Sequence, residues 1–275
     1  MGMLITITTY RKNTALEVLL QSLLDQGYSK NTIHVADDNS NLPDKTGKTA
    51  LETCQKFSGK LNIVFSYNEK SSGLGVAKNK NRNLRHFFEN KDSFDSILLL
   101  DDDICIVNPN IENYLKNDTG IEHVSGYWTD EDAYRTKKLV GLSGNQWVDD
   151  FPIIMQNKHI NHHLNGVQGC FVFCKKELAE KAMYFKSDWK YRYGTEHSQW
   201  SARLNALSGS TPNLFPSLRY SRRYLRGKNC PNDYVVEHEK IELNMLQYRE
   251  SLSRIERGLD LKEENHGLPK KGEIV

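Results

Sequence analysis

The run LLLDDD, residues 98–103, tells more about this chain than any other part of its sequence. The apolar run 97–100, preceded by Phe94, is typical of a strand buried on both faces of a parallel sheet. Asp101, Asp102 and Asp103 follow it directly. In open α/β sheets ligands bind outside the carboxyl ends of the strands, so the three carboxylates lie where a ligand is expected. Because crowded carboxylates repel one another, a divalent cation is a natural partner; a solvated acidic turn is the alternative.

Strand and helix patterns alternate on the amino-terminal side of this run. We expect strands at 3–9, 32–36 and 61–66, and helices at 14–26, 46–57 and 76–88. This rhythm predicts a parallel sheet with right-handed crossovers. Beyond residue 107 this alternation of strands and helices ends. An apolar segment at 166–174 predicts a further strand, and we expect helices at 195–207 and 235–257. The chain therefore reads as one α/β domain with an irregular second half and a helical carboxyl-terminal tail.

Composition is that of an ordinary soluble globular protein. Of the 275 residues 38% are hydrophobic and 26% charged, and the net charge is +2. We expect no membrane span, and a cytosolic location, because a strand begins within a few residues of Met1 and leaves no room for a leader peptide. The five cysteines lack paired zinc or redox spacings and are expected to be reduced.

Several motifs, taken in order, resemble those of nucleotide-sugar glycosyltransferases with the GT-A fold, family 2 type. TTYRKN at 8–13 looks like the first nucleotide-contacting loop, and VADDNS at 35–40 is similar to the family's VDDGS turn. GLGVAKNKN at 73–81 resembles its G…ARN segment, with Lys78 where arginine is usual, and LLLDDDI resembles its DxD strand. GTEHSQWSARL at 194–204 resembles the GEDxxxxxRL segment that carries the acceptor base, but His197 stands in the place of the aspartate.

The resemblance implies a Rossmann-like, mostly parallel sheet flanked by helices and a division of labour along the chain. Residues 1–107 would bind the nucleotide-sugar, and residues 108–228 would form the acceptor-binding half of the same domain. Residues 229–275 would be a helical extension and tail. The expected reaction moves a sugar from a nucleotide-diphosphate donor to a hydroxyl of a carbohydrate or other acceptor.

A bound Mn²⁺ or Mg²⁺ would neutralise the diphosphate leaving group as a Lewis acid. By resemblance, Asp103 would bind the metal most directly, with Asp101 on the ribose or metal side and Asp102 in the donor site. His238 resembles the late histidine that completes the metal site in some GT-A enzymes. A surface histidine on the last helix is the alternative.

The nucleotide would lie against the ends of the first two strands. Asp38 would accept a hydrogen bond from the base, which favours uracil and hence a UDP-sugar, while Thr8 and Tyr10 would lie nearby. Tyr10 could equally be a packing residue, and Asp37 could cap the following turn.

Three cations follow one face of the predicted helix 76–88. Lys78, Arg82 and Arg85 fall at i, i+4 and i+7, near a helix amino terminus that favours anions, and would suit a diphosphate. A solvated charged face is the alternative for the two arginines.

The helix expected at 195–207 has polar residues on its buried side. Glu196 and His197 lie one turn before the apolar stripe of Trp200, Leu204 and Leu207. We interpret one of the two as the general base that deprotonates the acceptor for an inverting displacement. A helix cap or a buried hydrogen bond is the alternative.

Other features leave competing functions open. A nucleotidyltransferase also combines such a sheet with metal-binding carboxylates, but TTYRKN lacks the glycine of its phosphate loop. LRYSRRYLRGK at 218–228 interleaves cations with tyrosines and could bind nucleic acid. The same segment could instead bring a nucleic-acid acceptor to a transferase, or form a mobile lid over the diphosphate. The segment 166–174 is expected to line the acceptor site. Candidates with weaker support are a histidine cluster and three tryptophans that could stack on a sugar: His159, His162, His163, Trp128, Trp147 and Trp189.

Overall fold

The computed structural model describes most of the chain. Its described residues are 2–44, 46–69, 75–106, 109–115, 120–129, 155–156, 168–187, 196–209, 213–219 and 238–262, and in 114, 126–129, 155–156, 168–170, 213–219 and 238–246 only the backbone is described. None of the described helices is long and apolar enough to cross a membrane.

A nine-stranded sheet runs through the molecule in the order β3-β2-β1-β4-β8-β6-β9-β5, with β7 paired to β9. The first four strands along this order pair in parallel, and β4 then pairs antiparallel with β8. The predicted α/β fold with its parallel amino-terminal sheet is therefore confirmed. The strands are β1 (Gly2–Thr9), β2 (Thr32–Asp37), β3 (Asn62–Tyr67), β4 (Phe94–Asp101), β5 (Ile104–Cys105), β6 (His123–Thr129), β7 (Met155–Gln156), β8 (Gln168–Lys175) and β9 (Asn213–Arg219).

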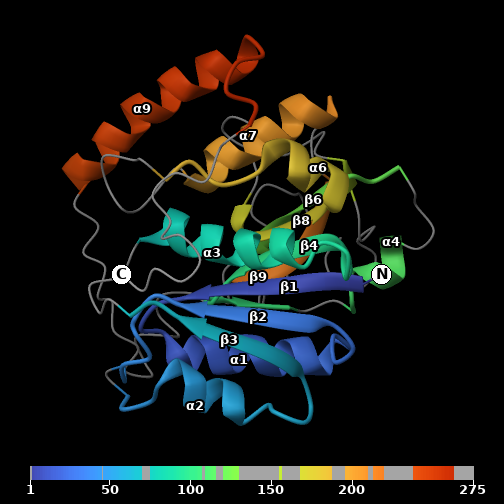
Figure 1. Ribbon diagram of the computed structural model, residues 1–275, viewed down its shortest axis with the longest axis vertical. Coiled ribbons are helices and arrows are strands. Elements are labelled where there is room, and N and C mark those ends of the chain that lie inside the picture. The colour runs from blue at the N-terminus through green and yellow to red at the C-terminus, as the bar shows by residue number, and fades with distance from the viewer. Residues whose placement is uncertain are drawn as a thin grey trace.

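Helices cover both faces of the parallel part of the sheet. Figure 1 shows α1 (Asn13–Asp25) and α2 (Ala50–Gln55) on one face and α3 (Val76–Glu89) on the other. Side chains of β4 alternate between two cores: Leu98 and Leu100 pack on the α1 side, while Ile97 and Leu99 pack on the α3 side. β4 is thus buried on both faces, as its apolar run predicts.

The second helix is shorter than the sequence suggests. The predicted start near Thr46 is wrong, because Asp44 Oδ1 accepts hydrogen bonds from the backbone and hydroxyl of Thr46 and holds a turn there. The helix begins after Thr49, whose side chain forms a reciprocal capping box with Glu52. A local side-chain bond therefore outcompetes the helix at Thr46.

The remaining described helices are α4 (Glu112–Leu115), α6 (Lys176–Ala182), α7 (Glu196–Ser208) and α9 (His238–Glu256). Of these, α7 contacts α3, α6 and α9. Trp200 of α7 is fully buried, stacks on Phe185 at 4.8 Å between ring centroids and donates from Nε1 to the Met183 carbonyl. Arg203 donates to the carbonyls of Ala182 and Tyr184. These contacts fix α7 against residues 182–185 at the end of α6.

His34 in β2 is a buried histidine that we expect to make the fold sensitive to acid. Its Nδ1 lies 2.7 Å from Asn83 Oδ1, and its ring stacks on His86 at 4.2 Å. Burial, and then the charge of His86, lowers the pKa of His34 to about 3. Because the unfolded chain binds this proton near pH 6.5 and the folded chain does not, stability falls as pH drops below about 6.5.

We therefore expect His34→Gln to reduce the acid sensitivity of the fold. Between about pH 7 and pH 5 the variant is expected to lose about 2 kcal/mol less unfolding free energy than the wild type. Urea unfolding at the two pH values measures this difference. If both proteins lost the same unfolding free energy between the two pH values, the assignment of the acid sensitivity to His34 would be wrong.

Candidate active site

The candidate site lies along the carboxyl ends of β1, β2 and β4. The strand register places Thr8 opposite Asp101 and Thr9 opposite Asp37, so the first loop, the VADDNS turn and the aspartate run meet at one edge. The sequence motifs at 8–13, 35–40 and 98–103 are therefore neighbours in space, as expected for this type of sheet.

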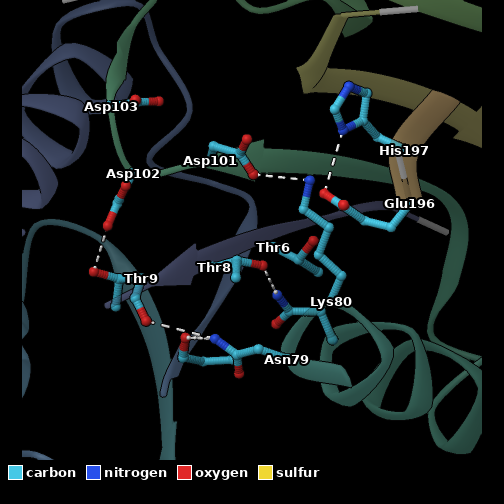
Figure 2. Close-up of polar contacts among 12 residues, drawn as sticks. Thr6, Thr8, Thr9, Asn79, Lys80, Asp101, Asp102, Asp103, Glu196 and His197 are labelled. Atoms are coloured by element: carbon cyan, nitrogen blue, oxygen red, sulfur yellow. Dashed lines mark hydrogen bonds and ion pairs between the residues drawn. The ribbon is translucent and has the colours of Figure 1, made fainter. Parts of the chain in front are cut away.

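The middle aspartate of the run anchors the first loop. Asp102 is buried; its Oδ2 accepts a hydrogen bond from the Thr9 hydroxyl at 2.8 Å and from the Tyr10 amide at 3.3 Å. Figure 2 shows this carboxylate pointing to Thr9 and away from Asp101. Burial raises the pKa of Asp102, and the negative charges of Asp101 and Asp103 add to this effect. The positive charge of Lys12 opposes it. Through these contacts Asp102 holds the first loop in place. Its contact with the donor remains a prediction.

Lys12 neutralises the far end of the aspartate run. Its Nζ lies 3.3 Å from Asp103 Oδ2 and 3.5 Å from Asp102 Oδ1. Although burial opposes it, the attraction of the three aspartates raises the pKa of Lys12. Lys12 stands in the loop after β1, and no periodic pattern in the sequence marks it.

Asp101 pairs with a lysine that the sequence analysis missed. Lys80 Nζ lies 3.0 Å from Asp101 Oδ1, and the lysine side chain is only 3% exposed whereas that of Asp101 is 31% exposed. A signal was present, since Lys80 shares the buried stripe of α3 with Ala77, Leu84 and Phe87. A buried lysine is costly unless a negative charge pairs with it, and the carboxylate of Asp101 provides that charge.

Glu196 and His197 open α7 beside this ion pair. Their side chains are 4% and 34% exposed, and Glu196 Oε1 lies 3.3 Å from His197 Nδ1. Figure 2 shows Lys80 between Asp101 and Glu196. Burial favours protonation of Glu196, but the hydrogen bond and charge of His197 and the charge of Lys80 outweigh it and lower its pKa to about 2. The fold thus joins the aspartate run to the pair predicted to hold the base.

The VADDNS turn is held by its two aspartates. Asp37 accepts hydrogen bonds from the amides of Asn39 and Asn41, which confirms its predicted capping role. Asp38 is buried, and its carboxylate accepts from the amide of Gly75 at 2.9 Å and from Asn68 Nδ2 at 3.3 Å. Each carboxylate oxygen has a second lone pair, so Asp38 keeps the capacity to accept from a base.

The polar face of α3 ties the helix to the sheet. Arg82 donates to the Asp37 carbonyl at 3.1 Å and to Ser66 Oγ at 3.2 Å. Asn83 Nδ2 donates to Thr8 Oγ1 at 3.0 Å. Arg82 is thus a structural link rather than a solvated cation, whereas the roles predicted for Lys78 and Thr8 in donor binding stay predictions.

Several candidates lie wholly or partly outside the described residues. His238 is the first residue of α9, but its side chain is not described, and the same holds for Trp128 in β6. The basic segment is described only as far as residue 219 in β9. Outside the described residues altogether lie His159, His162, His163, Trp147 and Trp189.

The donor atoms at the end of β4 fit a hard divalent cation. Asp101 and Asp103 offer carboxylate oxygens, and Mg²⁺ and Mn²⁺ complete their shells with phosphate and water when protein ligands are few. No group of three or more His, Cys, Asp or Glu within the described ranges forms a ready-made metal site. A cation here would share Asp103 with Lys12 and Asp101 with Lys80.

Comparison with known sequences decides the family. Residues 4–183, more than half of the chain, match the family described as glycosyl transferase family 2. The chain belongs to this family. The family 2 resemblance is thereby confirmed, and the nucleotidyltransferase alternative is set aside. Comparison with curated protein sequences gives no match.

Solved structures show the same fold. The complex of S. aureus TarS 1–349 with UDP-GlcNAc superposes with a TM-score of 0.61 at 17% identity, covering 91% of this chain and 66% of that one. The mannosyltransferase PcManGT from Pyrobaculum calidifontis, in complex with GDP-Man and Mn²⁺, gives a TM-score of 0.57 at 15% identity, covering 92% and 64%. Against two other TarS structures this family 2 chain spans 60% and 43% of the matched chain. The GT-A fold is thus confirmed.

Proposed function

We propose that this family 2 chain transfers a sugar from a nucleotide-diphosphate donor, a UDP-sugar, to a hydroxyl group of an acceptor. One observation carries the proposal: Lys80 pairs with Asp101 at the end of β4, and its charge also acts on Glu196, which pairs with His197 at the start of α7 (Figure 2). Donor-binding carboxylates and an acceptor base must lie on either side of the sugar, and this arrangement supports these two roles.

The proposed division of labour follows the chain. Residues 1–107 bind the donor, residues 108–228 bind the acceptor, and residues 229–275 form the helical extension. Asp101 and Asp103, with His238 as the proposed third ligand, would hold a Mn²⁺ or Mg²⁺ ion, which would neutralise charge on the diphosphate. Thr8, Tyr10, Asp38, Lys78 and Asp102 surround the nucleotide. The complexes of TarS with UDP-GlcNAc and of PcManGT with GDP-Man support a nucleotide-sugar donor.

His197 is the proposed general base, with Glu196 as the carboxylate that orients it. An ionised carboxylate can only accept hydrogen bonds, so the bond to Glu196 requires the proton of the neutral imidazole to be on Nδ1. Nε2 is then unprotonated and can accept a proton. The partly exposed histidine can reach an acceptor, whereas the buried glutamate cannot. Buried carboxylates orient a catalytic imidazole in the same way in other enzymes.

Inverting transfer then proceeds as a single displacement. His197 Nε2 takes the proton of the acceptor hydroxyl as its oxygen forms a bond to the anomeric carbon of the sugar. The bond from that carbon to the diphosphate oxygen breaks, and UDP leaves with the electron pair. The positive charges of Lys12 and Lys78 lie on the diphosphate side of this scheme.

Donor binding by the aspartate run predicts a metal-dependent stabilisation. With Mn²⁺ present, UDP or one UDP-sugar at about 100 times its dissociation constant is expected to stabilise the fold by about 2.7 kcal/mol. In Asp103→Asn this stabilisation is expected to disappear. A thermal-shift screen of UDP, UDP-sugars and GDP-Man, with and without Mn²⁺, measures it.

A control on the same strand isolates the site. Asp95 lies near the opposite end of β4, is exposed and pairs only locally with Ser96 in the described structure, so Asp95→Asn should keep the full shift. If no nucleotide stabilises the wild type, the proposed donor site is wrong. A basic segment at 218–228 that binds nucleic acid would then become the leading alternative.

A further inference from the structure

Lys80 is an unusual residue for its position. It is 2% exposed, although a buried ammonium group costs several kcal/mol unless nearby charges compensate it. Two carboxylates do so from different elements, Asp101 at the end of β4 and Glu196 at the start of α7. These carboxylates are 95 positions apart in the sequence, so the cation links two parts of the chain that no local motif connects.

A rigid framework fixes the place of this charge. Asn81, the next residue of α3, donates to the Phe185 carbonyl at 2.8 Å and accepts from the Phe185 amide at 2.7 Å. The ring of Phe185 lies 5.7 Å from Lys80 Nζ and stacks on Trp200 of α7. Phe185 therefore links α3 to α7 next to the lysine, which pre-organises the site.

We propose that Lys80 is a positioning residue. It lies between the donor side and the acceptor side of the site and fixes the positions of the side chains on both. Its ammonium group holds Asp101 on the donor side and Glu196 on the acceptor side, and through Glu196 it orients His197. The roles of the two carboxylates rest on the proposed function. Lys80 itself touches neither donor nor acceptor, so it acts only through these side chains.

A packing role for Lys80 makes a different prediction. If the stem of the side chain were its main contribution, methionine, which has a similar length and no charge, would replace it with little effect on the neighbouring carboxylates. If the charge positions Glu196, Lys80→Met must change the ionisation of that carboxylate. Arginine keeps the charge and should preserve it.

The decisive measurement is the titration of the Glu196 carboxyl group. In protein labelled with ¹³C at glutamate, the Glu196 signal is identified by its loss in Glu196→Gln and followed against pH. We expect Lys80→Met to raise the pKa of Glu196 by about one unit or more, because a nearby cation is removed. Lys80→Arg is expected to keep it low. An unchanged pKa in Lys80→Met would overturn the proposal.

Two variants guard this test. Lys91→Met removes an exposed lysine that pairs with Glu180 and should leave the titration of Glu196 unchanged. If Lys80→Met does not fold, the paired variant Lys80→Met/Glu196→Gln removes both buried charges and should recover a cooperative thermal transition. A paired variant no more stable than the single one would count against the charge link.

Kinetics separate this proposal from the function on which it rests. Lys80→Met is expected to lower kcat by at least tenfold and to be partly rescued by Lys80→Arg. In the Glu196→Gln background Lys80→Met should lower kcat by a smaller factor than in the wild type, because only its effect through Asp101 remains. Full additivity of the two losses would contradict action through Glu196. If no nucleotide-sugar is turned over while the pKa of Glu196 still responds to Lys80, the transferase proposal fails and the electrostatic link stands.

Discussion

His197→Gln is expected to lower kcat for sugar transfer by about a hundredfold to ten thousandfold, the usual contribution of a general base. The side chain lies at the start of α7, is partly exposed and has its Nδ1 held by the buried Glu196. Glutamine retains a hydrogen-bonding group of similar reach but cannot take the proton of the acceptor hydroxyl. Steady-state release of UDP from the accepted donor measures the loss.

The donor site serves as the internal control for this variant. UDP in the presence of Mn²⁺ should stabilise His197→Gln as much as the wild type, because the base contacts the acceptor and not the nucleotide. Glu196→Gln should also slow transfer, since it removes the carboxylate that orients the imidazole. Full transfer rates in both variants would show that the base lies elsewhere.

Trp200→Ala is expected to destabilise the fold by about 3–5 kcal/mol, the range found for truncation of buried aromatic residues. The indole is fully buried in the core that joins α3, β8 and α7, stacks on Phe185 and donates to the Met183 carbonyl. Truncation leaves a cavity and an unsatisfied carbonyl group. Urea unfolding followed by circular dichroism measures the change.

Two further variants bracket this effect. Trp200→Phe keeps most of the aromatic contact and should lose less stability than the alanine variant. Leu259→Ala removes a side chain that is 45% exposed and should change stability by less than about 0.5 kcal/mol. If Trp200→Ala were as stable as the surface variant, the packing that positions α7 would not depend on the indole.

Much of the parallel half of the fold follows from local sequence patterns. The apolar run of β4 and its abrupt acidic end predict both a doubly buried strand and the edge where the site lies. The start of α3 at Val76 agrees with its apolar periodicity. In α7, the buried Trp200 and Leu204 confirm the predicted stripe, and the burial of Glu196 agrees with the expectation that polar residues lie on that side.

The charges of the site were harder to predict because their partners are distant in sequence. Lys12 lies in a loop, where no period applies, and its ion pairs with Asp102 and Asp103 exist only once β1 and β4 are adjacent. Lys80 did leave a signal, a cation within an apolar stripe, but its partners Asp101 and Glu196 come from a strand and a later helix. Tertiary pairing, not local propensity, determines these contacts.

We expect the edge that carries the aspartate run to bind and activate a nucleotide-sugar. Release of free UDP from a panel of UDP-sugars, with water, sugars and oligosaccharides as acceptors and with Mn²⁺ present, tests it most directly. We expect repeated turnover of one donor by the wild type, unchanged turnover in Asp95→Asn and loss of turnover in Asp103→Asn. Equal turnover in the wild type and in Asp103→Asn, or none in the wild type with any donor, would contradict the claim.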